Sequence, residues 1–310
     1  KKIVDINAYS LEEQLVMPWI LYRIRPDIVH FPHINVPVIY LGKYIVTVHD
    51  LIKHFFRGTQ TTTRSHPVYW LKFIAYLLVF RWVIFWSRKI LVPSKTVKDE
   101  LTKEFAVSPS KVVVTYEASV MEPDFRKKKI DRPLPEKFAI YTGNAYPHKN
   151  LTRLIKVWRS VYAMTKTELV IVGSRSVFIS RVEDIIQSEK ASDYVQLFGY
   201  ISPEELPLIY DKALVYVFPT LSEGFGLPGL DAMKVGLPVV CSNIPVLKEI
   251  YEDSANYFDP RDEHDMISVI SKTINDEDFK KTLIKRGNVQ VAKYSWRDMA
   301  EKSLSAYCSI

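Results

Sequence analysis

Short apolar runs alternate with segments of helical periodicity along most of this chain. Such alternation is typical of βα units, in which parallel strands are connected by helices. A chain of 310 residues is long enough for two domains, each with its own core. The sequence therefore predicts an α/β fold with two parallel sheets.

The predicted strands form two series, separated by a charged, proline-bearing stretch at residues 126–136 that we interpret as a linker. We expect strands at 27–31, 44–49, 89–93 and 111–116, and then at 138–142, 168–172, 195–198, 213–218, 238–242 and 256–258. Six strands with intervening helices make a complete Rossmann-like domain. We predict domains at 1–130 and 131–296, with a C-terminal helix at 297–310 that joins the first domain.

The first domain looks incomplete. The chain opens on Lys1 rather than methionine, and no apolar strand with a glycine-rich turn precedes the helix expected around residues 10–24. A doubly wound domain normally supplies that pair first. We expect that at least one strand–loop–helix unit of about 30 residues is missing from the amino end.

Composition and charge exclude several classes of protein. Two cysteines, Cys241 and Cys308, make neither a disulfide framework nor a metal site, which favours a reducing, cytoplasmic compartment. The net charge of +7 suits anionic ligands or an anionic lipid surface. No basic run is interleaved with stacking aromatic residues, so we expect no nucleic-acid partner.

An aromatic stretch at residues 73–86 is interrupted by Arg81 and is too short to span a bilayer. The simplest interpretation is a buried helix. Its aromatic residues lie almost all round the helix, however, and basic residues stand at its margins, so it is also suited to a membrane interface. Both interpretations stay open, and each can hold for a different face.

A strand–glycine–helix junction at residues 222–233 carries two carboxylates, Glu223 and Asp231, eight positions apart. Glu223 falls at the carboxyl end of the strand, and Asp231 falls about one turn into the helix that Pro228 opens. Glycine in such a junction often only allows a strand and a helix to pack closely. Near the positive end of this helix, backbone N–H groups can also bind a diphosphate; they belong to Phe225, Gly226 and Leu227. The carboxylate spacing favours a sugar-nucleotide site.

Two Rossmann-like domains, a terminal helix that can cross back and the Glu223 segment resemble the retaining GT-B glycosyltransferases of family 4. The resemblance covers nearly the whole chain and is strongest over residues 141–296. The family's Glu-x7-Glu signature is present with Asp231 as its second member, which keeps the charge and shortens the side chain by one methylene. Bacterial and archaeal mannosyl- and glucosyltransferases belong to this family.

The resemblance implies a retaining hexosyltransferase that needs no metal or other cofactor. It would move a mannose- or glucose-type hexose from a nucleoside-diphosphate sugar to an acceptor hydroxyl, in the synthesis of a cell-envelope glycan or glycolipid. Guanine with mannose is the donor that the family favours. We expect a cytoplasmic enzyme that associates peripherally with the inner face of the cell membrane.

The resemblance also implies roles for particular residues. Lys149 would bind the donor diphosphate, and Asn144 stands where many relatives have an arginine. Asp231 would hold the ribose, and Glu223 would contact the sugar hydroxyls near the anomeric centre. The remaining candidates are Gly199, Tyr200 and Ile201 against the base, and Gly143, Gly173, Ser174 and Ser94 elsewhere in the cleft.

His49 ends the strand at 44–49, on the side where an open α/β sheet binds ligands. In relatives, the matching histidine reaches the transferred sugar, so the resemblance implies a catalytic role for His49. The neighbouring Asp50 can orient a ring or cap the next turn. Ser94 equally suits the N-cap of the following helix.

Other functions remain as alternatives. Asp276-Glu277-Asp278 is the only Asp-x-Asp string, and it opens a predicted helix, so we interpret it as structural rather than as a metal site. The same fold can carry a sugar-nucleotide epimerase or a phosphorylase, although no motif for a cofactor-bearing lysine is evident. A degenerate, transferase-like module that docks on a membrane or a partner is the non-enzymatic alternative.

Overall fold

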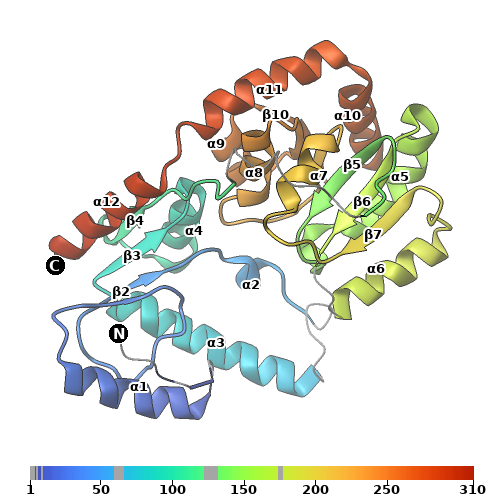
Figure 1. Cartoon of the computed structure of the whole chain (residues 1–310). Coiled ribbons are helices and arrows are strands. Elements are labelled where there is room, and N and C mark those ends of the chain that lie inside the picture. The colour runs from blue at the N-terminus through green and yellow to red at the C-terminus, as the bar shows by residue number, and fades with distance from the viewer. Residues whose placement is uncertain (1–3, 5, 8–9, 59–65, 122–131, 174–176) are drawn as a thin grey trace. The chain divides into compact units, whose positions relative to one another are not determined.

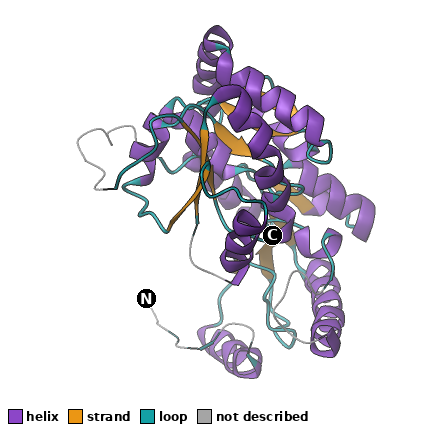
Figure 2. Cartoon of the chain, turned by 90° about the vertical axis from the view of Figure 1, so that its right-hand side faces the viewer, coloured by secondary structure: helices purple, strands orange, loops and turns teal. Residues whose placement is uncertain are grey.

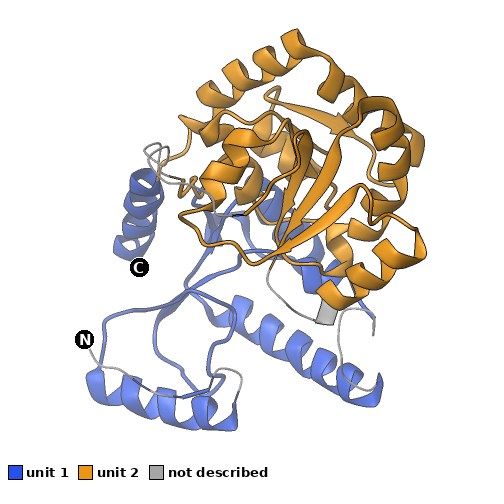
Figure 3. Cartoon of the chain, turned by 45° about the vertical axis from the view of Figure 1, so that its right-hand side comes forward, with its two compact units in different colours: residues 1–116, 296–310 blue, residues 117–295 orange. Residues whose placement is uncertain are grey.

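The structure, a computed structural model, describes residues 4, 6–7, 10–58, 66–121, 132–173 and 177–310. The chain divides into two compact units (Figure 3). Unit 1 comprises Lys1–Tyr116 and Trp296–Ile310, and unit 2 comprises Glu117–Ser295. Most of the predicted linker lies outside the described residues, so its boundaries stay a prediction.

Unit 1 contains a four-stranded parallel sheet in the order β1-β2-β3-β4, of which Figure 1 labels β2, β3 and β4. Its strands are β1 (Val29–Phe31), β2 (Tyr44–Thr47), β3 (Lys89–Val92) and β4 (Val112–Val114). They coincide with the first predicted series, although each is shorter. The strands follow one another in chain order, and the predicted missing unit lies outside this sequence and stays a prediction.

The helices of unit 1 are α1 (Leu11–Ile24), α2 (Ile52–Phe55), α3 (His66–Trp86), α4 (Lys95–Phe105) and α12 (Trp296–Cys308). Ser10 caps α1, because its hydroxyl accepts a hydrogen bond from the Glu13 N–H. The last helix packs on the sheet, where Ala306 forms a buried cluster with Ile45 and Leu91. The C-terminal helix is therefore part of unit 1.

Unit 2 contains a six-stranded parallel sheet in the order β10-β9-β8-β5-β6-β7. Its strands are β5 (Phe138–Thr142), β6 (Glu168–Val172), β7 (Val195–Gly199), β8 (Tyr216–Phe218), β9 (Val239–Ser242) and β10 (Ala255–Phe258). β8 begins three residues later than predicted, because α7 continues to Lys212 and the Ala213 N–H donates to its last turn. From β5, the strands β6 and β7 follow in chain order toward one edge of the sheet. The next strand, β8, lies on the other side of β5.

Helices cover both faces of this sheet (Figure 2). They are α5 (Leu151–Thr165), α6 (Val177–Ser188), α7 (Leu206–Lys212), α8 (Leu227–Val235), α9 (Pro245–Tyr251), α10 (Glu263–Asn275) and α11 (Glu277–Val291). α5 packs with α6 and α10, while α8 packs with α7 and α11. The strand order is that of the Rossmann fold, so the predicted doubly wound architecture is found in unit 2.

Candidate active site

The strand order of unit 2 reverses between β5 and β8, which are hydrogen-bonded neighbours in the sheet. In open α/β sheets, ligands bind at such a reversal, beyond the carboxyl ends of the strands. Lys149 lies in the loop after β5, and Glu223 lies in the loop after β8. The topology therefore brings the predicted cation and the predicted carboxylate to the position where a ligand is expected.

Backbone hydrogen bonds join the two loops directly. The His148 carbonyl, in a short 3-10 turn at Pro147–Lys149, accepts from the Leu221 N–H at 2.7 Å and from the Thr220 hydroxyl at 3.4 Å. Lys149 Nζ consequently lies 2.5 Å from Glu223 Oε1. The two side chains are only 12% and 11% exposed, so they form a largely buried ion pair.

The histidine next to Lys149 in the loop, His148, carries no charge of its own. Burial, with the positive charge of Lys149, lowers the pKa of His148 to about 4. His148 is therefore neutral near pH 7. The Lys149 ammonium also lies 5.4 Å from the centroid of the Phe218 ring, whose face attracts a cation. The Lys149 ammonium is therefore positioned by Glu223 and the Phe218 ring.

Tyr141, on β5, also holds the loop that follows this strand. This role was not predicted from the sequence. Its buried hydroxyl donates a 2.7 Å hydrogen bond to the Asn144 carbonyl. Burial, followed by the negative charge of Glu223, raises the pKa of Tyr141 well above its usual value. The phenol therefore remains a donor. Strand 138–142 also contains the polar Thr142, and nothing local in it marks the Tyr141 hydroxyl for this contact.

Three predicted glycines line up at the ends of adjacent strands. The Gly143 N–H donates to Val172, and the Gly173 N–H donates to Gly199, each at 3.0 Å. A Cβ on Gly173 would lie 2.5 Å from the Gly143 carbonyl oxygen, so a larger residue does not fit there. Gly173 therefore lets the loops after β5 and β6 approach closely.

The residues predicted to contact the base differ in exposure. Tyr200 is 63% exposed, whereas the side chain of Ile201 is buried in the core. Gly199 has a φ of +70° and open space around its Cα. Only the tyrosine ring and the glycine backbone therefore present surface to a ligand. Ser174 lies outside the described residues.

The glycine-rich turn before α8 is held by a buried tyrosine. Gly226 is the N-cap of α8, with a left-handed φ of +102°, and the Tyr251 hydroxyl donates to its carbonyl. Leu227 begins the helix, so Pro228 is its second residue rather than its first. Phe225 is buried against Tyr294, with ring centroids 5.6 Å apart. The predicted diphosphate-binding amides thus lie at the amino end of α8, on a rigidly supported turn.

Asp231, one turn further along α8, is half-buried and already hydrogen-bonded. Its Oδ1 accepts from the Ser119 hydroxyl at 2.7 Å and from the Val120 N–H at 3.2 Å. Burial nevertheless raises the pKa of this carboxyl group. The predicted ribose-binding residue therefore also anchors residues 119–120 at the start of unit 2, a contact that the sequence did not indicate.

Two candidates belong to unit 1. His49 is exposed just beyond the end of β2, and its Nε2 lies 3.0 Å from the Pro32 carbonyl. Asp50 accepts from the Ile52 N–H at 2.9 Å, so it caps the next turn. Ser94 is buried and accepts from the Val97 N–H at 3.2 Å, as an N-cap of α4 does. The catalytic role of His49 stays a prediction.

The Asp276-Glu277-Asp278 string opens α11, where Asp276 accepts a hydrogen bond from the Phe279 N–H. Asp278 pairs with Lys281 in the first turns of the same helix. These contacts are those of a helix start. Within the ranges that the structure describes, no group of three or more histidine, cysteine, aspartate or glutamate side chains is arranged to hold a metal ion.

We expect Lys149→Ala to lower the free energy of unfolding by about 1–3 kcal/mol, because it leaves the Glu223 carboxylate largely buried without its partner. Chemical denaturation of Lys149→Ala measures this effect, and a cycle of Lys149→Met, Glu223→Leu and the double variant Lys149→Met/Glu223→Leu measures the coupling. The double variant should recover part of the loss. Additive losses in the double variant would contradict an energetic coupling between the two side chains.

A Rossmann-type sheet whose switch point carries a lysine–glutamate pair beside a glycine-capped helix is an arrangement that suits a nucleotide ligand. Residues 123–290 match the family described as glycosyl transferases group 1, and residues 6–118 match glycosyltransferase family 4. The chain belongs to this group 1, or family 4, of glycosyltransferases. It is therefore a glycosyltransferase, and the family implies a nucleotide-sugar donor and a glycan acceptor.

Two curated relatives are bacterial enzymes. The chain is 31% identical over 266 residues to the O-antigen chain mannosyltransferase RfbU of Salmonella typhimurium, which covers 84% of this chain and 71% of that protein. It is 26% identical over 311 residues to the O-antigen chain mannosyltransferase B of Escherichia coli, covering 97% of this chain and 79% of that protein. The chain is thus related to O-antigen mannosyltransferases.

Solved structures share the fold at low sequence identity. Sucrose-phosphate synthase from Thermosynechococcus elongatus superposes with a TM-score of 0.78 and 20% identity, covering 100% of this chain and 81% of that one. WaaG, a glycosyltransferase of lipopolysaccharide biosynthesis, gives a TM-score of 0.75 at 13% identity, covering 97% and 85%. The GT-B fold expected from the sequence is confirmed.

Proposed function

We propose that this enzyme is a retaining, metal-independent mannosyltransferase that acts on the hydroxyl of a cell-envelope glycan precursor. The relatives named as O-antigen mannosyltransferases support the choice of sugar and acceptor class. The observation that carries the proposal is the Lys149–Glu223 pair at the switch point of unit 2. In a sugar diphosphate, the cation can bind the diphosphate and the carboxylate can bind the sugar hydroxyls.

Lys149 would move from Glu223 to the donor diphosphate when the donor binds. The amides of Gly226 and Leu227 at the start of α8 would add donors to the same phosphates. Together they would neutralise the leaving nucleoside diphosphate in a site from which water is largely excluded. In this way the chain itself can supply the charge that a divalent cation supplies in other transferases, with Asn144 at the edge of the phosphate loop.

In the proposed reaction, the bond between the sugar C1 and the β-phosphate oxygen breaks. A new bond forms between C1 and the acceptor oxygen on the same face of the sugar. The acceptor hydroxyl proton passes to the departing phosphate, so charges and atoms balance. Glu223 would bind the sugar hydroxyls and stabilise positive charge near C1, and His49 would have the catalytic role that the family resemblance implies.

The nucleoside would lie toward β7 and α8. Asp231 would exchange a bond to Ser119 or Val120 for the ribose hydroxyls, and the base would rest on Tyr200 and Gly199. We place the reaction in the cytoplasm, where nucleotide sugars are made.

A thermal-shift panel of nucleotide sugars tests this proposal. We expect one donor, a GDP-hexose in the simplest case, to raise the melting temperature by about 5 °C at saturating concentration, equally with EDTA and with Mg²⁺. The same donor should release nucleoside diphosphate only when a glycan acceptor is added.

Two results would contradict the proposal. A shift that disappears with EDTA would show that the donor needs a metal. Formation of an epimerised nucleotide sugar without an acceptor would favour an epimerase on the same fold.

A further inference from the structure

The surface of unit 1 carries an apolar helix that the sugar-transfer site does not use. Most of the exposed large apolar side chains among the described residues belong to unit 1, and α3 contributes the largest group. By length and composition, α3 is apolar enough to cross a membrane. It has no acidic residue in its 21 residues.

α3 presents two apolar stripes on opposite sides. Successive residues of an α-helix are about 100° apart, so residues 71, 74, 78, 82 and 85 fall within about 80° of arc. All five are exposed, and Leu71 and Phe85 are 71% and 74% exposed. The opposite stripe is buried in the core of unit 1 and comprises Phe73, Phe80, Val83 and Ile84.

The buried stripe prevents α3 from crossing a bilayer. Phe80 and Val83 are at most 1% exposed, and the Tyr44 hydroxyl donates to the Val83 carbonyl at 3.1 Å. Inserting the whole helix would remove these residues from the core. The exposed stripe alone is available, which is the arrangement of a helix that lies in a membrane interface.

Basic side chains flank the exposed stripe on both sides. Lys72 and Arg81 are exposed, and they lie about 100° and 80° from its first residue in opposite directions. Arg88 is exposed just beyond the end of the helix. In an interfacial helix, basic residues at these positions reach lipid phosphates while the apolar stripe enters the acyl boundary.

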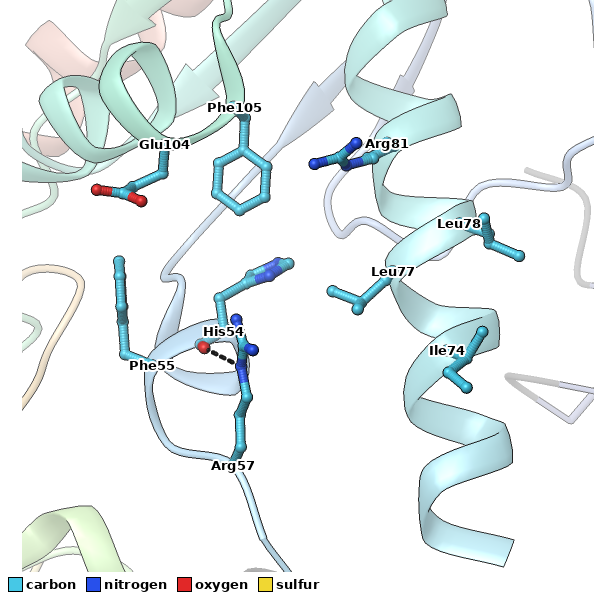
Figure 4. Close-up of a pocket in the computed structure, with 9 residues that line it drawn as sticks. All are labelled: His54, Phe55, Arg57, Ile74, Leu77, Leu78, Arg81, Glu104 and Phe105. Atoms are coloured by element: carbon cyan, nitrogen blue, oxygen red, sulfur yellow. Dashed lines mark hydrogen bonds between the residues drawn. The ribbon is translucent and has the colours of Figure 1, made fainter.

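A cavity of about 380 Å³ opens beside the stripe, between α3, α2 and the last turn of α4 (Figure 4). Ile74, Leu77 and Leu78 form its α3 wall, and Arg57 and Arg81 reach into it from two sides. The Arg57 Nε donates to the His54 carbonyl at 2.7 Å, which positions this guanidinium. The cavity therefore combines an apolar wall with two cations.

The other titratable groups of the cavity do not cancel this charge. Burial, with the charges of Arg57 and Lys53, lowers the pKa of His54 to about 4, so its ring is neutral. Glu104 is exposed on the α4 side, beyond the Phe105 ring from Arg81. Two guanidinium groups face one carboxylate, and the lining has a net positive charge.

We propose that the exposed stripe of α3 docks on a bilayer that contains anionic lipid, and that the Arg57–Arg81 cavity receives the phosphate of one such lipid. The charge pattern selects this occupant. A second copy would bring the same basic flanks together in a symmetric contact, with no acidic residue on α3 to pair with them. The proposal needs no sugar transfer, so it can succeed or fail independently of the proposed function.

Co-sedimentation of the whole protein with vesicles tests the docking surface. We compare vesicles of phosphatidylcholine alone with vesicles that contain about one third phosphatidylglycerol. The wild type should bind the anionic vesicles at low salt, and binding should weaken as salt rises. No binding to anionic vesicles at low salt would overturn the proposal.

Substitutions on the stripe test whether vesicle binding needs the apolar side chains or only the positive charge of the protein. Leu71→Glu/Phe85→Glu should lower binding to anionic vesicles about tenfold or more. Leu304→Glu, on α12 and 59% exposed, is the matched control in the same unit and should bind like the wild type. Unchanged binding of the stripe variant would overturn the proposal. So would a wild-type dimer that this variant converts to a monomer, because the stripe would then bind a second copy.

Substitutions in the cavity test the lipid phosphate. Arg57→Ala/Arg81→Ala should lower the preference for anionic over neutral vesicles about tenfold, whereas Arg159→Ala on α5 of unit 2 should not change it. Glu104→Gln should increase the preference, because it removes the opposing charge. Circular dichroism and the donor-induced thermal shift show that each variant is folded with unit 2 intact. Equal preference in all variants would exclude the cavity as a lipid-phosphate site.

Discussion

Replacing Glu223 by glutamine is expected to lower the rate of sugar transfer by about a hundredfold to a thousandfold. The amide has the same shape, but it cannot stabilise positive charge near C1 of the sugar. Because Lys149 is then released from its ion pair, the donor diphosphate should bind as tightly as to the wild type, or more tightly. Initial rates with the best donor, with binding of the nucleoside diphosphate measured by calorimetry, separate the two effects.

Glu183→Gln is the matched control, because Glu183 is an exposed carboxylate on α6 of the same unit. It should leave both rate and donor binding unchanged. A Glu223→Gln enzyme that keeps more than about a tenth of the wild-type rate would place the critical carboxylate elsewhere.

Gly226→Ala should strongly destabilise unit 2, because it combines a steric clash with a left-handed backbone. A Cβ there would lie 2.6 Å from the Tyr251 hydroxyl oxygen and 2.7 Å from Leu247 Cδ2, at a backbone φ of +102°. Left-handed strain and overpacking add to an expected loss of about 2–5 kcal/mol in the free energy of unfolding. The turn that presents the α8 amides should shift as well, so donor binding should weaken.

Gly236→Ala, at the other end of α8, separates backbone strain from overpacking. Gly236 also has a positive φ, of +85°, but the nearest heavy atom to its Cβ would be 3.9 Å away. The Gly236→Ala substitution should lower the free energy of unfolding by only about 1–2 kcal/mol, through backbone strain, and leave donor binding intact. Equal melting temperatures for the two variants would show that the contact with Tyr251 does not constrain the turn.

The sequence predicted the sheets well, because their strands are marked locally. β5 and β6 have the predicted bounds, since each is a short apolar run between polar turns. The place of the candidate site could also be predicted, because Lys149 and Glu223 each lie in a loop that follows a strand. Only the hydrogen bonds from Thr220 and Leu221 to His148 turn this expectation into a buried ion pair.

Contacts between distant segments could not be predicted. Tyr141 and Tyr251 reach the loop carbonyls of Asn144 and Gly226 through the core, and nothing local marks a hydroxyl for such a role. Asp231 binds Ser119, which is 112 positions away.

α3 extends beyond the apolar stretch at residues 73–86 that the sequence marked. The helix begins at His66, whereas the sequence predicted an apolar stretch from residue 73. Aromatic residues on both faces of α3 conceal its helical period, so the pattern gave no clear first turn. The two interpretations of this helix correspond to two faces. One face is buried in the core, and the other is the exposed stripe.

A crystal structure of the enzyme with its nucleoside diphosphate tests the central claim most directly. We expect the β-phosphate within hydrogen-bonding distance of Lys149 Nζ and of the Gly226 or Leu227 amide, with the Glu223 carboxylate turned toward the vacant sugar position. A nucleotide bound away from the loops that follow β5 and β8, with Lys149 still paired to Glu223, would contradict the account.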